Sequence, residues 1–195
     1  VSYDPHRNRI RSRPVTLNSH QKTLLGVAAA LVALCVVARL LPHPPNFAPA
    51  TAVALFGCMF FARRWHAGAV VAAGMLAGDW FIGFYDIGVM VTVYASMLMP
   101  LAARRFLRQS SGVARVAAVA LLSGVGFYLT TNAAVWFFTG AYPPTAEGLA
   151  ASYVAGLPFL KWTLLGNLFY AAILFGGLEL LKRRVGGMAT ATAHV

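Results

Sequence analysis

The chain has 195 residues, of which 59% are hydrophobic and 11% are charged, and its formal net charge at pH 7 is +11. A mean hydropathy of +0.68 excludes an ordinary soluble domain and indicates an integral membrane protein. At about 20 residues for each span, the chain has room for about six spans and none for a separate soluble domain.

The chain begins with a polar, basic arm, residues 1–22, which is followed by an apolar segment over residues 23–41. This segment is long enough to cross a bilayer. No small-residue cleavage site follows it, so we expect a retained first helix and not a signal peptide.

Five more apolar segments predict five more membrane helices. Pro49 falls in the first turn of the second segment, and Pro100 is expected to bend or end the fourth. At about 24 Å, the second helix is short for a bilayer. The segments cover residues 47–62, 67–85, 87–103, 113–139 and 158–181. The expected fold is an all-α integral membrane protein with six transmembrane helices.

The basic residues predict the orientation of these helices, because loops rich in Lys and Arg stay in the cytoplasm. All sixteen except Arg39 and Lys161 lie before the first segment or after the second, fourth or sixth. The opposite loops, residues 42–46, 86 and 140–157, contain no Lys or Arg. We therefore expect a multi-pass membrane protein with both termini in the cytoplasm. Sorting and contact with the lipid bilayer explain the charge without nucleic acid.

The chain lacks the common motifs of soluble catalysis. It contains no P-loop, H-E-x-x-H, C-x-x-C or G-x-S-x-G pattern, and no internal repeat. Few ionisable residues lie in or beside the helices, whereas a proton relay usually has more. They are Arg39, Asp79, Asp86, Lys161 and Glu179. These features favour a binding or transport protein over an ATPase or hydrolase.

Two cysteines lie in apolar segments and differ in their surroundings. Cys35 has only Leu, Val and Ala around it, which indicates packing. Cys58 follows Gly57 on a helix that is entered through a proline-rich loop. A glycine allows close approach of a large group. Spacing alone still leaves packing as the more common role for Cys58.

The stretch HPPNFAPATAVALFGC, residues 43–58, resembles the BtuM family of bacterial vitamin B12 transporters. That family is related to the S-components of energy-coupling factor (ECF) transporters. The resemblance implies an S-component-like bundle of the bacterial inner membrane that binds and takes up cobalamin, with the Cys58 thiolate as an axial ligand of its cobalt. A thiolate is a strong donor to Co(III). We therefore expect base-off cobalamin, and loss of cyanide from cyanocobalamin as a secondary catalytic activity of Cys58.

The second axial ligand of cobalt is open between His43, on the first loop, and His6, on the N-terminal arm. A corrin ring is wide and flat and carries amide side chains, so its pocket needs aromatic faces and hydrogen-bonding groups. For each aromatic residue, a place in the interfacial belt is the alternative. The residues expected to bind cobalamin are Asn46, Phe47, Asp79, Trp80, Tyr85, Tyr94, Asn132 and Tyr142.

We expect one membrane domain, with the arm at 1–22, a six-helix bundle at 23–184 and a C-terminal tail at 185–195. Ala29 and Ala33 form a small-xxx-small face on the first helix, which could meet the membrane subunit of an ECF module. A solitary transporter and a docked S-component stay open. So do two other classes: a carrier of another vitamin or a metal with a structural Cys58, and a membrane enzyme or assembly factor that uses Asp79 or Cys58.

Overall fold

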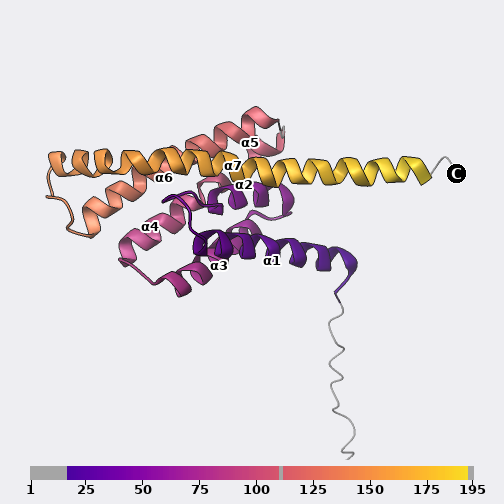
Figure 1. Cartoon of the computed structure of the whole chain (residues 1–195), viewed down its shortest axis with the longest axis horizontal. Helices are drawn as coiled ribbons and strands as arrows, with labels where there is room; N and C mark the ends of the chain where they lie inside the picture. The colour runs from indigo at the N-terminus through magenta and orange to yellow at the C-terminus, as the bar shows by residue number, and fades with distance from the viewer. Residues whose placement is uncertain (1–16, 110–111, 193–195) are drawn as a thin grey trace, which may run out of the picture.

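The computed structural model describes residues 17–109 and 112–192, which form an all-helical bundle (Figure 1). The helices are α1 (Ser19–Leu40), α2 (Ala50–Phe60), α3 (Arg64–Ile82), α4 (Ile87–Met97), the 3₁₀ helix η1 (Met99–Leu101), α5 (Arg104–Gln109), α6 (Val113–Phe138) and α7 (Ala146–Thr192). The predicted all-α class is confirmed.

Helix α1 begins at Ser19, four residues before the predicted start, because Asn18 caps it. The Asn18 side chain accepts a bond from the Gln21 backbone N–H at 2.8 Å, and the Gln21 side chain accepts one from the Asn18 N–H at 3.0 Å. This reciprocal pair satisfies two N–H groups that the first turn leaves free.

Helix α2 lies at the centre of the bundle and packs against α3 and α7 (Figure 1). It is apolar on every face, and a helix of that kind is stable only when neighbours surround it. Every residue from Ala50 to Cys58 is buried. The helix is about 16 Å long, so it does not by itself match the thickness of a bilayer.

The prediction that Pro100 interrupts the fourth segment is confirmed. Helix α4 ends at Met97, and η1 carries the chain past Pro100 to α5. Proline has no N–H to continue an α-helix. The interruption places the Pro100 carbonyl against helix α2.

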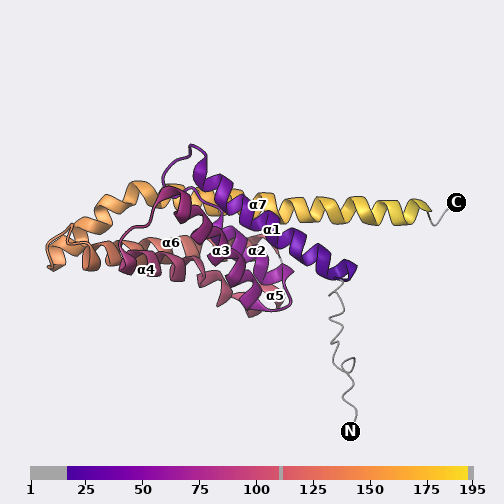
Figure 2. The ribbon, with the colours of Figure 1, turned by 90° about the horizontal axis from the view of Figure 1, so that it is seen from below.

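The predicted loop over residues 140–157 is wrong, because α7 begins at Ala146 and Pro158 lies inside it. The Thr145 hydroxyl accepts a bond from the Gly148 N–H at 3.2 Å, which caps the new start. Proline is tolerated inside membrane helices when neighbouring groups satisfy the freed backbone. At about 70 Å, α7 extends well past the other helices at its C-terminal end (Figure 2).

Four helical stretches are long and apolar enough to cross a membrane. They are Ser19–Leu40, Ile87–Gln109, Val113–Phe138 and Ala146–Arg184. Large apolar side chains also face outward over much of the bundle, among them Leu122 and Phe137. An exposed apolar surface of this extent suits contact with lipid and not with water.

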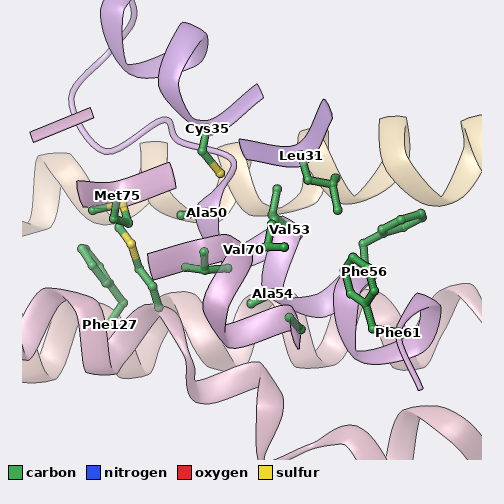
Figure 3. Close-up of a cluster of buried hydrophobic side chains, with 13 residues drawn as sticks. Leu31, Cys35, Ala50, Val53, Ala54, Phe56, Phe61, Val70, Met75 and Phe127 are labelled. Atoms are coloured by element: carbon green, nitrogen blue, oxygen red, sulfur yellow. The ribbon is translucent and has the colours of Figure 1, made fainter. Parts of the chain in front are cut away.

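Two clusters of buried side chains hold the helices around α2. Figure 3 shows the first, in which Phe127 of α6 lies at one end and Phe56 and Phe61 at the other. The second cluster surrounds Leu55 and Cys58. Both clusters use α2 as their common wall, so α2 positions everything that borders it.

Candidate functional site

Two adjoining cavities lie where α1 ends and α2 begins. The first, here called the Arg39 cavity, has a volume of about 360 Å³, and the second, the Asn132 cavity, about 350 Å³. Asn46, Val93 and Phe127 line both. Cavities of this size are typical of small-molecule sites. We call this part of the bundle the cavity end.

The loop between α1 and α2 covers both cavities and is shaped by a tight turn. The Phe47 N–H donates to the Pro44 carbonyl at 3.1 Å, and Asn46 has a φ of 66°. Proline followed by a residue with positive φ is the pattern of a type II turn, in which Gly and Asn are favoured. The turn directs the Asn46 side chain to the wall that the two cavities share.

A buried charged network lies beside the Arg39 cavity. The Arg39 guanidinium donates to one Asp79 carboxylate oxygen, and the Tyr94 hydroxyl donates to the other. Asp79 is completely buried, whereas the Arg39 side chain keeps 17% of its exposure and lines the cavity. The network ties α1, α3 and α4 together.

Helices α1 and α3 approach closely enough for this network because α3 carries two glycines at their crossing. A Cβ at Gly74 would collide with Cys35, and a Cβ at Gly78 would collide with Arg39. Glycines four residues apart allow close contact between membrane helices. Because Gly78 has no side chain, the Arg39 guanidinium can occupy the space where a Cβ would otherwise lie.

Five of the residues predicted from the sequence line the cavities. His43, Asn46 and Tyr85 line the Arg39 cavity, and Asn132 and Tyr142 join Asn46 around the Asn132 cavity. Residues from four separate segments thus meet at the cavity end.

Two of these lining residues, Tyr85 and His43, differ in the hydrogen bonds that they can offer to a ligand. Burial, followed by the nearby Asp79 carboxylate, raises the pKa of Tyr85, while Arg39 lowers it. The Tyr85 hydroxyl is therefore protonated at neutral pH and can donate a hydrogen bond. Nδ1 of His43 lies 2.7 Å from the Pro44 carbonyl, so that nitrogen is already used in the loop.

Other predicted residues lie outside both cavities. Phe47 packs against Phe169 and Tyr170 of α7, with ring centroids 5.4 and 5.5 Å away. Trp80 is 74% exposed on the outer surface of α3, where the alternative role in an interfacial belt fits its position. Asp79 and Tyr94 reach the site only through Arg39. His6 lies outside the described residues.

Cys58 lies near the opposite end of α2, which we call the packed end. It is completely buried among Leu55, Leu107 and Ala120. Its thiol donates a weak bond to the Pro100 carbonyl at 3.6 Å. It is absent from the lining of both cavities. Cys35 is also a free, buried thiol, so the two cysteines have similar environments.

The C-terminal end of α2, beyond Cys58, is fixed by an arginine. Arg104 donates to the carbonyls of Phe61 and Ala62 at 3.1 and 2.6 Å. The last carbonyls of a helix have no partner within the helix, so these bonds satisfy groups that would otherwise need water. They also hold α5 against α2 beside Cys58.

A family model described as a family of unknown function, DUF6580, matches residues 19–191. The chain belongs to the DUF6580 family. No curated protein and no solved structure matches it. The DUF6580 match includes every residue that lines either cavity, together with Cys58 and the Arg39–Asp79 pair.

Sequence reasoning missed several polar residues that line the Arg39 cavity of this DUF6580 chain. In the sequence, Arg39 stands out only as an ionisable residue in an apolar segment, and Thr51, Thr163 and Asn167 do not stand out. Thr163 and Asn167 are four residues apart, so they share a face of α7. Polar residues at this spacing in a long apolar segment are a signal that could have located the wall.

The two cavities of the DUF6580 chain share a chemical character. Apart from Arg39 and His43, their polar lining consists of Asn, Thr and Tyr side chains, which can both donate and accept hydrogen bonds, and none of the described residues lining them is Asp or Glu. Apolar and aromatic side chains such as Val93 and Phe127 form the rest. Such a site can bind a partly apolar solute that carries hydrogen-bond acceptors.

Proposed function

We propose that this protein binds a solute at the outer face of the bacterial inner membrane and carries it inward, and that the solute is cobalamin. The observation that supports binding is the pair of adjoining cavities at one end of an apolar bundle, lined by hydrogen-bond donors and aromatic rings. Cobalamin follows from the resemblance of residues 43–58 to the BtuM family.

The proposed orientation places the cavity end outside. Arg63 and Arg64 follow α2, and Arg104 and Arg105 begin α5, so these charges lie at the end of α2 opposite the loop. Basic residues stay cytoplasmic. In this arrangement α1, α2, α3, α4 with α5, α6 and α7 form six passes with both termini in the cytoplasm.

Cobalamin is larger than a drug-sized ligand, so neither cavity encloses it in the described conformation. Its entry therefore requires the 41–49 loop to open and the two cavities to merge. The residues that both cavities share, Asn46, Val93 and Phe127, form the partition that must move.

Ligation of cobalt by Cys58 requires a second movement. Cys58 lies seven positions after Thr51, the last residue of α2 that lines a cavity, which is about 10 Å along the helix. The contact between Cys58 and Pro100 must open for cobalt to come within bonding distance. Binding in this proposal is accompanied by displacement of η1 from α2.

The proposed ligation has a defined chemical balance. The Cys58 thiol loses its proton, the sulfur donates an electron pair to Co(III), and the benzimidazole of the vitamin leaves the lower face. A strong thiolate donor weakens the bond on the other face. Cyanide then leaves with its electron pair and takes up the proton, so that cobalt stays Co(III).

The test is a titration of purified protein in detergent with cyanocobalamin, followed by absorption spectroscopy and cyanide release. Cys58→Ser is the variant, and Cys35→Ser is the matched control because both thiols are free and buried. Wild type and Cys35→Ser should shift the corrin spectrum, and Cys58→Ser should not. A wild-type spectrum unchanged after hours would contradict the ligation.

A second candidate is an S-component-like carrier of another vitamin or a metal, with Cys58 as a packing residue. The absence of Cys58 from both cavities, and its tight packing, favour this candidate. It predicts that Cys58→Ser and Cys35→Ser behave alike with every ligand. Screening thermal stability against a panel of vitamins and divalent cations would identify the ligand.

The proposal includes two modes of transport, as an S-component docked on an ECF module or as a solitary transporter. Ala29 and Ala33 are both exposed on α1, on a face that the described residues leave uncovered. Growth of a cobalamin-dependent strain that carries this gene, with and without an ECF module, tests it. Growth only with the module supports a docked S-component, and growth without it supports a solitary transporter.

A further inference from the structure

We propose that Arg39 binds an oxyanion of the transported solute, and that Asp79 is the positioning residue for Arg39. In cobalamin the oxyanion is the phosphodiester of the nucleotide loop. The identity of the solute rests on the proposed function, but the oxyanion site rests on the geometry around Arg39.

The first observation is the charge of the cavity wall. Arg39 is the one permanently charged side chain among the described residues that line the two cavities. Its neighbours in the wall, Asn46 and Asn167, add amide groups that can donate. A solute entering the Arg39 cavity thus meets a guanidinium among neutral donors.

The second observation is that Asp79 faces Arg39 and not the cavity. Both Asp79 oxygens are used inside the protein, one by Arg39 and one by Tyr94, and the carboxylate is completely buried. It does not line either cavity. Asp79 therefore orients the guanidinium without presenting its own charge to a solute.

The third observation is that Arg39 has donor capacity left over. One terminal nitrogen, Nη1, donates only to the Met75 thioether sulfur at 3.1 Å, and a thioether is a weak acceptor. The Nε atom is buried and has no hydrogen-bond partner. A phosphate or carboxylate oxygen at Nη1 would replace the weakest of these contacts with a charge-assisted bond.

A purely structural ion pair is the competing interpretation. Pairs of this kind hold helices together in many proteins and often contribute little net stability. The two interpretations differ in one measurable respect. A structural pair affects all ligands alike, whereas an oxyanion site affects only ligands that carry the oxyanion.

The test compares cobalamin with cobinamide, a corrinoid without the nucleotide loop and its phosphate. The variant is Arg39→Gln/Asp79→Asn, which removes both charges together and so leaves no buried unpaired ion. We expect the variant to weaken cobalamin binding at least about tenfold and cobinamide binding by less than about twofold. Equal weakening of both ligands, or of neither, would overturn the oxyanion site.

A second variant guards against a folding defect. Arg39→Lys keeps the charge that pairs with Asp79 but lacks the planar fork of donors. It should elute as a folded protein on size exclusion and should still weaken cobalamin binding more than cobinamide binding. Retention of full cobalamin affinity in Arg39→Lys would count against specific recognition by the guanidinium.

A measurement without corrinoids tests the oxyanion site independently of the cobalamin proposal. If wild type binds neither corrinoid, the cobalamin proposal fails, and inorganic phosphate decides the oxyanion site. About 20 mM phosphate, against chloride at equal ionic strength, should raise the unfolding temperature of wild type but not of Arg39→Gln/Asp79→Asn. The same shift in both proteins, or no shift in wild type, would overturn the site.

Discussion

The two ends of helix α2 differ in almost every property except their burial. At the cavity end, Thr51 borders open space, and a turn centred on Asn46 closes the loop above it. At the packed end, Leu55 and Cys58 are completely enclosed by side chains. A short, wholly apolar helix therefore serves two purposes, forming the wall of a cavity at one end and the core of the bundle at the other.

This difference indicates which end of α2 contributes to ligand recognition and which end contributes to stability. Arg39 and several neutral polar side chains line the cavity end, where a solute can reach them. Polar groups at the packed end contact other protein groups and line neither cavity, as in the contacts of Cys58 with Pro100 and of Arg104 with Phe61. Substitutions of the side chains that line the cavities should accordingly act mainly on ligand binding, and substitutions at the packed end mainly on folding.

The largest expected effect belongs to the charged network beside the Arg39 cavity. Asp79→Asn leaves the Arg39 guanidinium mostly buried without its counterion, which should cost about 3–5 kcal/mol of unfolding free energy. Thermal unfolding in detergent measures it. Glu179→Gln is the control, since its pair with Arg183 is exposed and should contribute about 0.5 kcal/mol or less. Equal losses in the two variants would contradict the network.

Core packing at the packed end should have the next largest effect. Leu55→Ala removes a completely buried side chain and should cost about 2–5 kcal/mol. Val93→Ala, at the cavity end, shortens a half-buried side chain that borders existing space and should cost about 1 kcal/mol. If denaturant unfolding finds Val93→Ala the more damaging, the distinction between the two ends fails.

A smaller effect is expected at the crossing of α1 and α3. Gly78→Ala places a methyl group on Arg39, so helix separation should cost about 1–3 kcal/mol and weaken ligand binding. Gly177→Ala is matched to it, because that position has nothing within 4 Å, and should be neutral or slightly stabilising. Unfolding temperature and ligand affinity are measured on both, and a neutral Gly78→Ala would refute close contact at the crossing.

The smallest effect on stability is expected in the loop. Asn46→Ala should cost about 1 kcal/mol because alanine resists a positive φ, whereas Asn46→Gly should change stability by about 0.5 kcal/mol or less. Both variants remove the same amide from the cavities, so both should weaken solute binding equally. Unchanged binding by both folded variants would show that the amide itself does not contact the solute.

Much of the architecture could be predicted from apolar segments and prolines. The break at Pro100 follows from the missing N–H of proline, and His43, Asn46 and Tyr85 meet because short loops end neighbouring helices at the same level. The start of α7 could not be predicted by treating Pro158 as a helix beginning. The residues before Pro158 continue the helix. A proline can lie inside a membrane helix when neighbouring groups satisfy the backbone that it leaves free.

The geometry of the site depends on contacts between residues far apart in the sequence, and no local sequence pattern predicts such contacts. Arg39 and Asp79 are forty residues apart, and their pairing depends on the space above Gly78. The isolation of Cys58 from the cavities is likewise set by η1, which fills the space beside α2. The prediction that Cys58 binds cobalt stays a prediction, and it now requires a movement that the sequence did not indicate.

The length of α7 has a mechanical consequence. The helix runs without interruption from Thr163 and Asn167, in the cavity wall, to Thr192, well beyond the bundle. A tilt of about 5° around Asn167 displaces Thr192 by about 3 Å, because about 37 Å of helix lies between them. Any tilt of α7 that begins at the cavity wall is therefore magnified at the C-terminal end of the helix.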